Sequence, residues 1–200
     1  KYGRSEKPII VVPSGNFGNL TAGFFAKKIG LPSELMVAAV NVNSGIPGYL
    51  ATKSLVVSKT VPTLSNAMDV GNPSNWGRIV DHFGGDPAKI ANSLKAIAVT
   101  DRETEATIFS IHEKYGYFVD PHTAVGLRAA EEIAKRGFSR TPIVVLSTAH
   151  PAKFRETVER VTRRTLEIPD RLAAVLGRSK HKISVTPKAE EVARIIKATQ

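Results

Sequence analysis

Four short apolar runs alternate along this 200-residue chain with longer segments of helical composition. The runs lie at residues 9–12, 36–42, 96–99 and 142–146 and consist mainly of Ile, Val, Leu and Ala. Strands joined through a helix run parallel, because the crossover returns the chain to the same end of the sheet. The pattern therefore predicts an α/β fold with three layers, in which helices cover both faces of an open, mostly parallel sheet.

The segments between these runs carry the start and stop signals of helices. Gly116 and Gly137 each follow a helical segment, and Asp101 is predicted to cap the helix that it begins. Residues 54–73 show no regular period and contain prolines and glycines, so we expect an irregular segment of the kind that often carries function. Helices are predicted at residues 20–28, 46–53, 75–83, 87–93, 101–115, 122–136, 151–164, 171–176 and 189–198.

Composition bounds the class of protein. With 42% hydrophobic and 23% charged residues, the chain is typical of soluble globular proteins, and it contains no apolar run long enough to span a membrane. Residues 1–12 lack the apolar core of a signal peptide. Cysteine is absent, which excludes disulfides and thiolate metal sites, and no metal site is predicted. We therefore expect a cytoplasmic protein that does not bind a membrane.

The positive charge is concentrated in the last third of the chain. Residues 135–200 contain 15 Lys and Arg against 6 Asp and Glu, whereas residues 1–134 contain 13 against 12. Such a segment attracts polyanions, but it has few aromatic residues to stack on bases and no recognisable nucleic-acid-binding module. We therefore expect solvated helix faces or an acidic protein partner, and no nucleic-acid binding.

A glycine-rich loop, SGNFGN at residues 14–19, follows the first predicted strand. It stands directly before a helix, whose first N–H groups and positive dipole end suit a phosphate monoester. The loop has neither the Lys-Ser/Thr of the Walker motif nor the three-glycine spacing of the dinucleotide fingerprint. From this loop alone, two interpretations stay open: a phosphate site, or a tight turn with an asparagine cap.

A second polar loop, STAHPAKF at residues 147–154, follows the fourth predicted strand. Ligands bind at the carboxyl ends of parallel strands, so we expect the two loops to face each other across a cleft. Taken singly, Thr148 fits a helix cap and His150 fits a structural hydrogen-bonding group. The functional interpretation therefore depends on the two loops together.

Five blocks of the sequence stand out when taken together: VPSGNFGNLTAG at 12–23, NVN at 41–43, LSNAMD at 64–69, DPHTAVG at 120–126 and STAHPAKF at 147–154. In their order and spacing, over residues 8–170, these blocks resemble threonine synthase. The resemblance implies a fold type II pyridoxal-phosphate enzyme that converts O-phospho-L-homoserine and water to L-threonine and phosphate.

The resemblance also implies roles for particular residues. Thr148 would hydrogen-bond the pyridine nitrogen of the cofactor, and a hydroxyl, unlike a carboxylate, does not force that nitrogen to be protonated. Near the substrate the resemblance places Asn43, Asn66 and His150. The phosphate of the cofactor would be held by Ser14, Gly15, Asn16, Phe17, Gly18 and Asn19.

One departure from the family concerns catalysis. The family's Schiff-base lysine lies between phenylalanine and aspartate in an N-terminal motif, and nothing in residues 1–13 matches that motif. Lys1 and Lys7 have other neighbours, and the chain begins without methionine. We therefore expect the C-terminal portion of the enzyme, without its catalytic-lysine half and inactive alone.

The expected organisation is a single α/β domain over residues 1–200. Its threonine-synthase-like core would span residues 8–170, and residues 171–200 would form a basic helical extension. The implied partners are O-phosphohomoserine and the missing N-terminal half of the same enzyme, and the resemblance is compatible with a homo-oligomer. The alternative is a non-catalytic domain of the same fold that binds a phosphate ligand or another protein.

Overall fold

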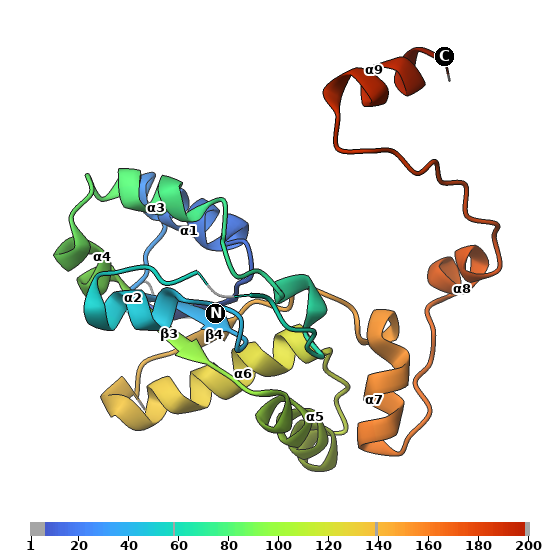
Figure 1. Cartoon of the computed structure of the whole chain (residues 1–200). Coiled ribbons are helices and arrows are strands. Elements are labelled where there is room, and N and C mark those ends of the chain that lie inside the picture. Colours follow the sequence, from blue (N-terminus) through green and yellow to red (C-terminus); the bar gives the residue numbers. More distant parts are fainter. Residues whose placement is uncertain (1–6, 58, 139, 199–200) are drawn as a thin grey trace. The chain divides into compact units, whose positions relative to one another are not determined.

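The four apolar runs form a four-stranded parallel sheet in the computed structural model, which describes residues 7–57, 59–138 and 140–198 (Figure 1). The strands are β1 (Ile9–Pro13), β2 (Leu35–Val40), β3 (Leu94–Ala98) and β4 (Ile143–Val145), and their spatial order is β3-β2-β1-β4. Ile9 of β1 is in register with Leu35 of β2 and with Ile143 of β4. Contacts divide the chain into two units, residues 1–166 and 167–200, and each is described by itself.

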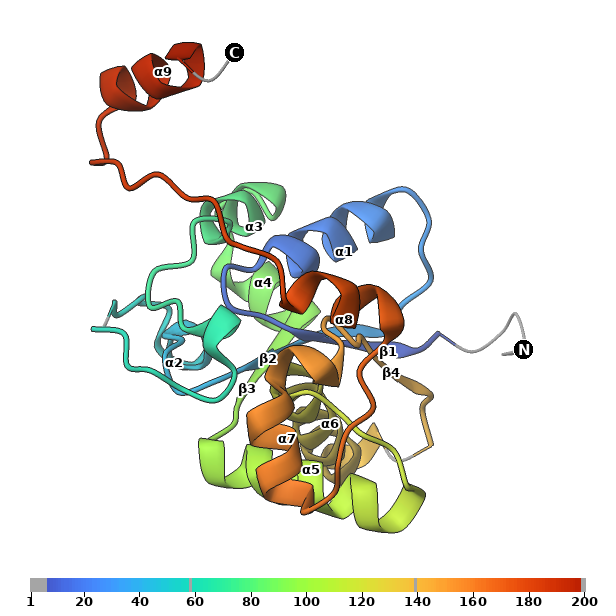
Figure 2. The ribbon, with the colours of Figure 1, turned by 90° about the vertical axis from the view of Figure 1, so that its right-hand side faces the viewer.

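Helices of the first unit cover both faces of the sheet, as predicted. In Figure 1, α1 to α4 lie on one side of the strands and α6 lies on the other. Figure 2 shows α5 and α7 beside α6, on the side away from α1 and α3. The bounds are α1 (Gly18–Lys28), α2 (Ile46–Thr52), α3 (Trp76–His82), α4 (Pro87–Ser93), α5 (Asp101–Tyr115), α6 (Pro121–Ile133) and α7 (Arg155–Thr162).

Successive side chains of each strand point to opposite faces of the sheet and so contribute to two separate hydrophobic cores. On β2, Met36, Ala38 and Val40 pack under α1 to α4, whereas Leu35, Val37 and Ala39 pack under α6. All six residues of β2 are buried, as expected for an inner strand of a parallel sheet that is covered on both faces. A smaller cluster joins α5, α6 and α7, so α7 is anchored to the layer below the sheet.

β4 differs from its prediction. Its Pro-Ile-Val-Val-Leu sequence predicts a fully buried strand, but Ile143, Val144 and Val145 are only half-buried and Leu146 is exposed. The reason is its position, because within the described residues β4 pairs with β1 alone and forms an edge of the sheet. A run of apolar residues cannot distinguish an inner strand from an edge strand.

The irregular segment at residues 54–73 contains one short 3₁₀ turn, η1 (Asn66–Met68). The Asp69 carboxylate anchors this segment: its Oδ1 accepts hydrogen bonds from Asn41 Nδ2 at 2.8 Å and from Thr63 Oγ1 at 2.6 Å. Asp101 adds a second anchor, because its carboxylate accepts from the backbone N–H of Leu64. The segment therefore has a defined conformation although it lacks a regular period.

The remaining short helical turns are η2 (Ala134–Phe138), which extends α6, and η3 (Pro151–Phe154), which precedes α7. The second unit contains α8 (Asp170–Leu176) and α9 (Ala189–Ala198), and no residue of either helix is buried. Across the described ranges, no helix is long and apolar enough to cross a membrane. The predicted domain boundaries at residues 8, 170 and 171 stay predictions.

Candidate functional site

The order in which strands are added to the parallel sheet switches sides at β1. From β1 the chain continues to β2 and then β3 on one side, whereas β4 lies on the other side of β1. Loops that leave the carboxyl ends of two such strands separate and create a crevice, which is where open α/β sheets bind ligands. A cavity of about 280 Å³ lies there, lined by residues 13–19, 67–68, 148–149 and 153–154 and by His122.

The loop after β1 offers a row of unpaired donors to this cavity. Within the described residues, none of the backbone N–H groups from Gly15 to Leu20 donates a hydrogen bond to the protein. The Phe17 side chain is buried and meets the Trp76 ring edge-on at 5.7 Å between centroids, and its backbone adopts a left-handed conformation with φ of 61°. The buried Phe17 side chain holds the loop in place, and the backbone N–H groups of the loop can bind an anion.

The two glycines of this loop have different surroundings. A Cβ atom on Gly15 would lie 2.5 Å from Met68 Cα and 3.0 Å from the Ala67 carbonyl oxygen, so glycine is required for the contact between two walls of the cavity. A Cβ atom on Gly18 would have Asn75 Nδ2 as its nearest neighbour, at 3.7 Å. Gly15 is therefore required by the neighbouring wall, whereas the space beside Gly18 is open enough for a Cβ atom.

The polar side chains of the loop are mostly engaged within the protein. Ser14 Oγ donates to the Val12 carbonyl oxygen at 2.8 Å and is buried. Asn16 Oδ1 accepts from the Ser74 N–H at 2.6 Å, which ties the loop to the segment before α3. Asn19 is exposed and makes no side-chain hydrogen bond within the described residues. Backbone N–H groups therefore outnumber side chains as available donors.

Thr148 lies in the opposite wall of the cavity, although about 130 residues separate it from the glycine-rich loop. Its side chain is exposed, and its hydroxyl makes no hydrogen bond to any described residue. The hydroxyl therefore does not cap η3. His150 is the cap, because its Nδ1 accepts from the Ala152 N–H at 3.1 Å, and His150 does not line the cavity.

The other two predicted substrate residues also lie outside the cavity lining. Asn43 is buried, and its amide is used internally: Nδ2 donates to Asp69 Oδ1 and to the Val61 carbonyl oxygen, each at 2.9 Å, and Oδ1 accepts from the Val61 N–H. Asn66 is exposed at the start of η1, one residue before the cavity wall. Their roles toward a substrate stay predictions.

Two titratable residues of the cavity received no role from the sequence. Lys153 carries the only formally charged side chain among the lining residues, and no ion pair engages it within the described residues. His122 is 4% exposed and stands in the first turn of α6. The Asp-Pro-His-Thr sequence is the available signal, since an Asp cap followed by Pro fixes the start of α6 at the edge of the sheet that carries the cavity.

The electrostatics of the cavity favour an anion. Burial by itself raises the pKa of Asp120. Hydrogen bonds from His122 and Thr123 lower this pKa by more than burial raises it, so the pKa lies below its ordinary value and the carboxyl is ionised at neutral pH. This carboxylate is 1% exposed and does not line the cavity. The lining thus presents backbone N–H groups, the Asn19 amide, the unengaged Thr148 hydroxyl and the Lys153 cation, with no carboxylate. Among the described residues, no cluster of His, Asp or Glu could hold a metal ion.

Comparison with known proteins agrees with this geometry. Residues 123–196 match the family model described as "Threonine synthase, C-terminal". The crystal structure of threonine synthase from Escherichia coli superposes on all of this chain with a TM-score of 0.86 and 34% identity, and the chain covers 46% of it. The chain is a homologue of part of threonine synthase. The predicted fold class is thereby confirmed, since the sheet and its helices match part of this fold type II family.

Two further threonine synthases show the extent of the match. The enzyme of Haemophilus influenzae is 41% identical over 172 residues, which are 84% of this chain and 39% of that protein. The structure of pyridoxal-phosphate-bound threonine synthase from Brucella melitensis has a TM-score of 0.83 and 28% identity, covering 98% of this chain and 47% of that one. The chain therefore spans less than half the length of the threonine synthases that it matches.

Proposed function

We propose that this chain supplies the phosphate-binding and ring-nitrogen-binding walls of a pyridoxal-phosphate site in threonine synthase, which converts O-phospho-L-homoserine and water to L-threonine and phosphate. The supporting observation is that residues 14–19 and Thr148 line one cavity. The substrate O-phosphohomoserine and the rest of the enzyme, which carries the Schiff-base lysine, are the partners in this proposal.

The residues of the cavity fit such a cofactor. A phosphate monoester would accept hydrogen bonds from the unpaired N–H groups after Gly15, at the positive end of the α1 dipole. At the other wall, the Thr148 hydroxyl has no protein partner within the described residues and can donate to a ring nitrogen. Pyridoxal phosphate, when bound, supplies the electron sink for elimination and replacement chemistry.

The protein's own contribution is positioning. Anchoring of Phe17 in the core and of Asn16 on Ser74 holds the N–H groups in place before a ligand arrives, which reduces the entropy lost on binding. A neutral hydroxyl at the ring nitrogen leaves that nitrogen unprotonated, so the electron sink is weaker than a carboxylate partner would make it. Lys153 adds a positive charge to the same cavity.

Inorganic phosphate is expected to bind weakly to the chain, and Gly18→Asp is expected to weaken this binding at least tenfold. The aspartate would place a second negative charge at the helix start, where roughly 4 kcal/mol of repulsion acts at 4 Å in an effective dielectric of about 20. Calorimetric titration measures the affinity. Gly18→Asn is the matched control, because it has the same size without the charge.

Two results of this titration would count against the proposal. The first is the absence of phosphate binding to the unmodified chain at low ionic strength. The second is an equal loss of affinity in Gly18→Asp and Gly18→Asn, which would mean that bulk and not charge determines the effect. Retained binding in Gly18→Asn with loss in Gly18→Asp supports an anion site at the start of α1.

A further inference from the structure

The first turn of α6 contacts two walls of the cavity, one at residues 67–68 and the other at residues 147–154. The carboxylate of Asp120, the N-cap residue of that helix, is 1% exposed. It accepts hydrogen bonds from the backbone N–H of His122 at 2.9 Å and from the side chains of His122 and Thr123. One buried carboxylate thus orients two side chains that reach toward different walls.

His122 connects this carboxylate to the wall formed by Ala67 and Met68. Its Nε2 accepts a hydrogen bond from the backbone N–H of Ala67 at 3.2 Å, and only an unprotonated nitrogen can accept. The proton of the neutral ring is therefore on Nδ1, which donates to Asp120 Oδ1 at 3.0 Å. The ring also meets the ring of Phe154, which lines the same cavity, at 4.8 Å between centroids.

Thr123 connects the same carboxylate to the wall that carries Thr148. The Thr123 hydroxyl donates to Asp120 Oδ2, which leaves its oxygen to accept from Ser147 Oγ at 3.3 Å. Ser147 directly precedes Thr148. The network therefore runs from one side of the cavity to the other through Asp120.

Both ring nitrogens of His122 are engaged within the protein, so this histidine cannot exchange a proton with a ligand while it holds Ala67. We propose that His122 is a positioning residue, which holds the Ala67–Met68 wall against the glycine-rich loop in the conformation that binds a phosphate ester. Asp120 fixes the tautomer that makes this contact. The inference rests on the proposed function, since it assigns a role within the same site.

Two amide substitutions separate the two hydrogen bonds of the ring. In His122→Asn, the amide nitrogen takes the place of Nδ1 and keeps the bond to Asp120, but the side chain is too short to reach Ala67. In His122→Gln, the longer amide places an oxygen where Nε2 was, so it can accept from the Ala67 N–H. Both variants lose the ring contact with Phe154, so this contact cannot account for a difference between them.

The experiment measures binding of pyridoxine 5′-phosphate, which has the phosphate and ring of the cofactor but no aldehyde to react with lysines. His122→Asn is expected to weaken binding roughly tenfold and to accelerate hydrogen exchange of the Ala67 amide, whereas His122→Gln stays within about threefold of the unmodified chain. His82→Asn, on α3 and outside the cavity, is the matched control and should bind normally.

Equal affinity in the Asn and Gln variants would overturn the inference, and so would unchanged Ala67 exchange in His122→Asn. If His122→Asn does not fold, His122→Gln decides, because retained affinity supports the inference and a tenfold loss contradicts it. If the unmodified chain does not bind pyridoxine 5′-phosphate, the proposed function fails. In that case the exchange of the Ala67 amide still decides whether His122 holds the wall.

Discussion

The chain alone, incubated with pyridoxal phosphate and O-phosphohomoserine, is expected to release no phosphate above the background of the reagents. The reaction requires a lysine that binds the cofactor covalently and then moves protons at the Cα and Cβ atoms of the substrate. The resemblance implies a lysine motif that residues 1–13 do not match, so we expect no lysine of this chain to take that role. Restoration of activity by the N-terminal portion of a threonine synthase is expected, since that portion would supply the lysine.

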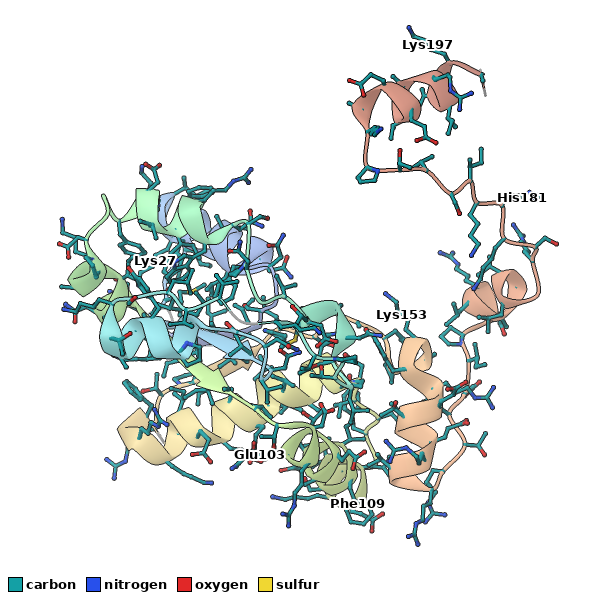
Figure 3. All side chains as sticks on the ribbon, viewed as in Figure 1. Lys27, Glu103, Phe109, Lys153, His181 and Lys197 are labelled. Atoms are coloured by element: carbon teal, nitrogen blue, oxygen red, sulfur yellow. The ribbon has the colours of Figure 1, made fainter. Side chains whose placement is uncertain are left out.

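The positions of the lysines sharpen this prediction. Lys27 and Lys28 end α1, and Lys53 caps the end of α2, and none of them lines the cavity. Lys153, labelled in Figure 3 just before α7, does line the cavity. Within the described residues, Lys153 is therefore the lysine that could react with a cofactor bound in the cavity.

The variant Lys153→Ala tests whether Lys153 acts as a catalytic lysine. Reduction with borohydride followed by peptide mapping is expected to find pyridoxal phosphate on several surface lysines of the unmodified chain, without turnover. Phosphate release by the unmodified chain that disappears in Lys153→Ala would contradict our account, because it would make Lys153 the catalytic lysine. Lys27→Ala is the control for loss of a lysine outside the cavity.

Gly15→Ala is expected to lower the free energy of unfolding by about 2 kcal/mol and to abolish measurable phosphate binding. The added Cβ would stand 2.5 Å from Met68 Cα, a backbone atom that can move only with its whole segment. Asp69 resists that movement, because its carboxylate accepts hydrogen bonds from Asn41, Asn43 and Thr63. Displacement of this wall also strains the Ala67–His122 bond.

Chemical denaturation and calorimetric titration measure the two effects. Gly18→Ala is the control, since its Cβ would make only an ordinary contact and its stability should stay within about 0.5 kcal/mol of the unmodified chain. Equal stability of the two variants would show that the Gly15 contact is not required. A stable Gly15→Ala chain that still binds phosphate would refute the link between the two walls.

Sequence patterns predicted the strands and α-helices of the first unit, because the periods of strands and helices are local properties of the sequence. The order of strand, loop and helix also placed the loops after β1 and β4 at one edge of the sheet, where the cavity lies. The predicted cap of α5 is wrong. Thr100 caps α5 through a capping box with Glu103, whereas the predicted cap, Asp101, accepts from Leu64 instead.

Contacts between distant segments explain the remaining differences. Nothing in the local pattern at Asn43 shows that its amide is used by residues 61 and 69, which only the folded irregular segment brings near. Likewise, His122 contacts the cavity wall at η1 only in the folded chain, where its Nε2 accepts a hydrogen bond from the Ala67 N–H. Contacts between side chains that lie tens of residues apart leave no periodic signal, so the sequence did not show the internal hydrogen bonds of Asn43 and gave His122 no role. The role of Asn43 toward a substrate, which the resemblance implies, stays a prediction.

The central claim is that the glycine-rich loop binds the phosphate of the cofactor and that Thr148 binds its ring nitrogen. The most direct test compares the binding of inorganic phosphate and of pyridoxine 5′-phosphate to one variant. Thr148→Val retains the shape of the side chain and removes the hydroxyl, which has no partner within the described residues. We predict that it binds inorganic phosphate as the unmodified chain does but binds pyridoxine 5′-phosphate roughly five- to tenfold more weakly. Equal affinity of Thr148→Val and the unmodified chain for pyridoxine 5′-phosphate would contradict the account.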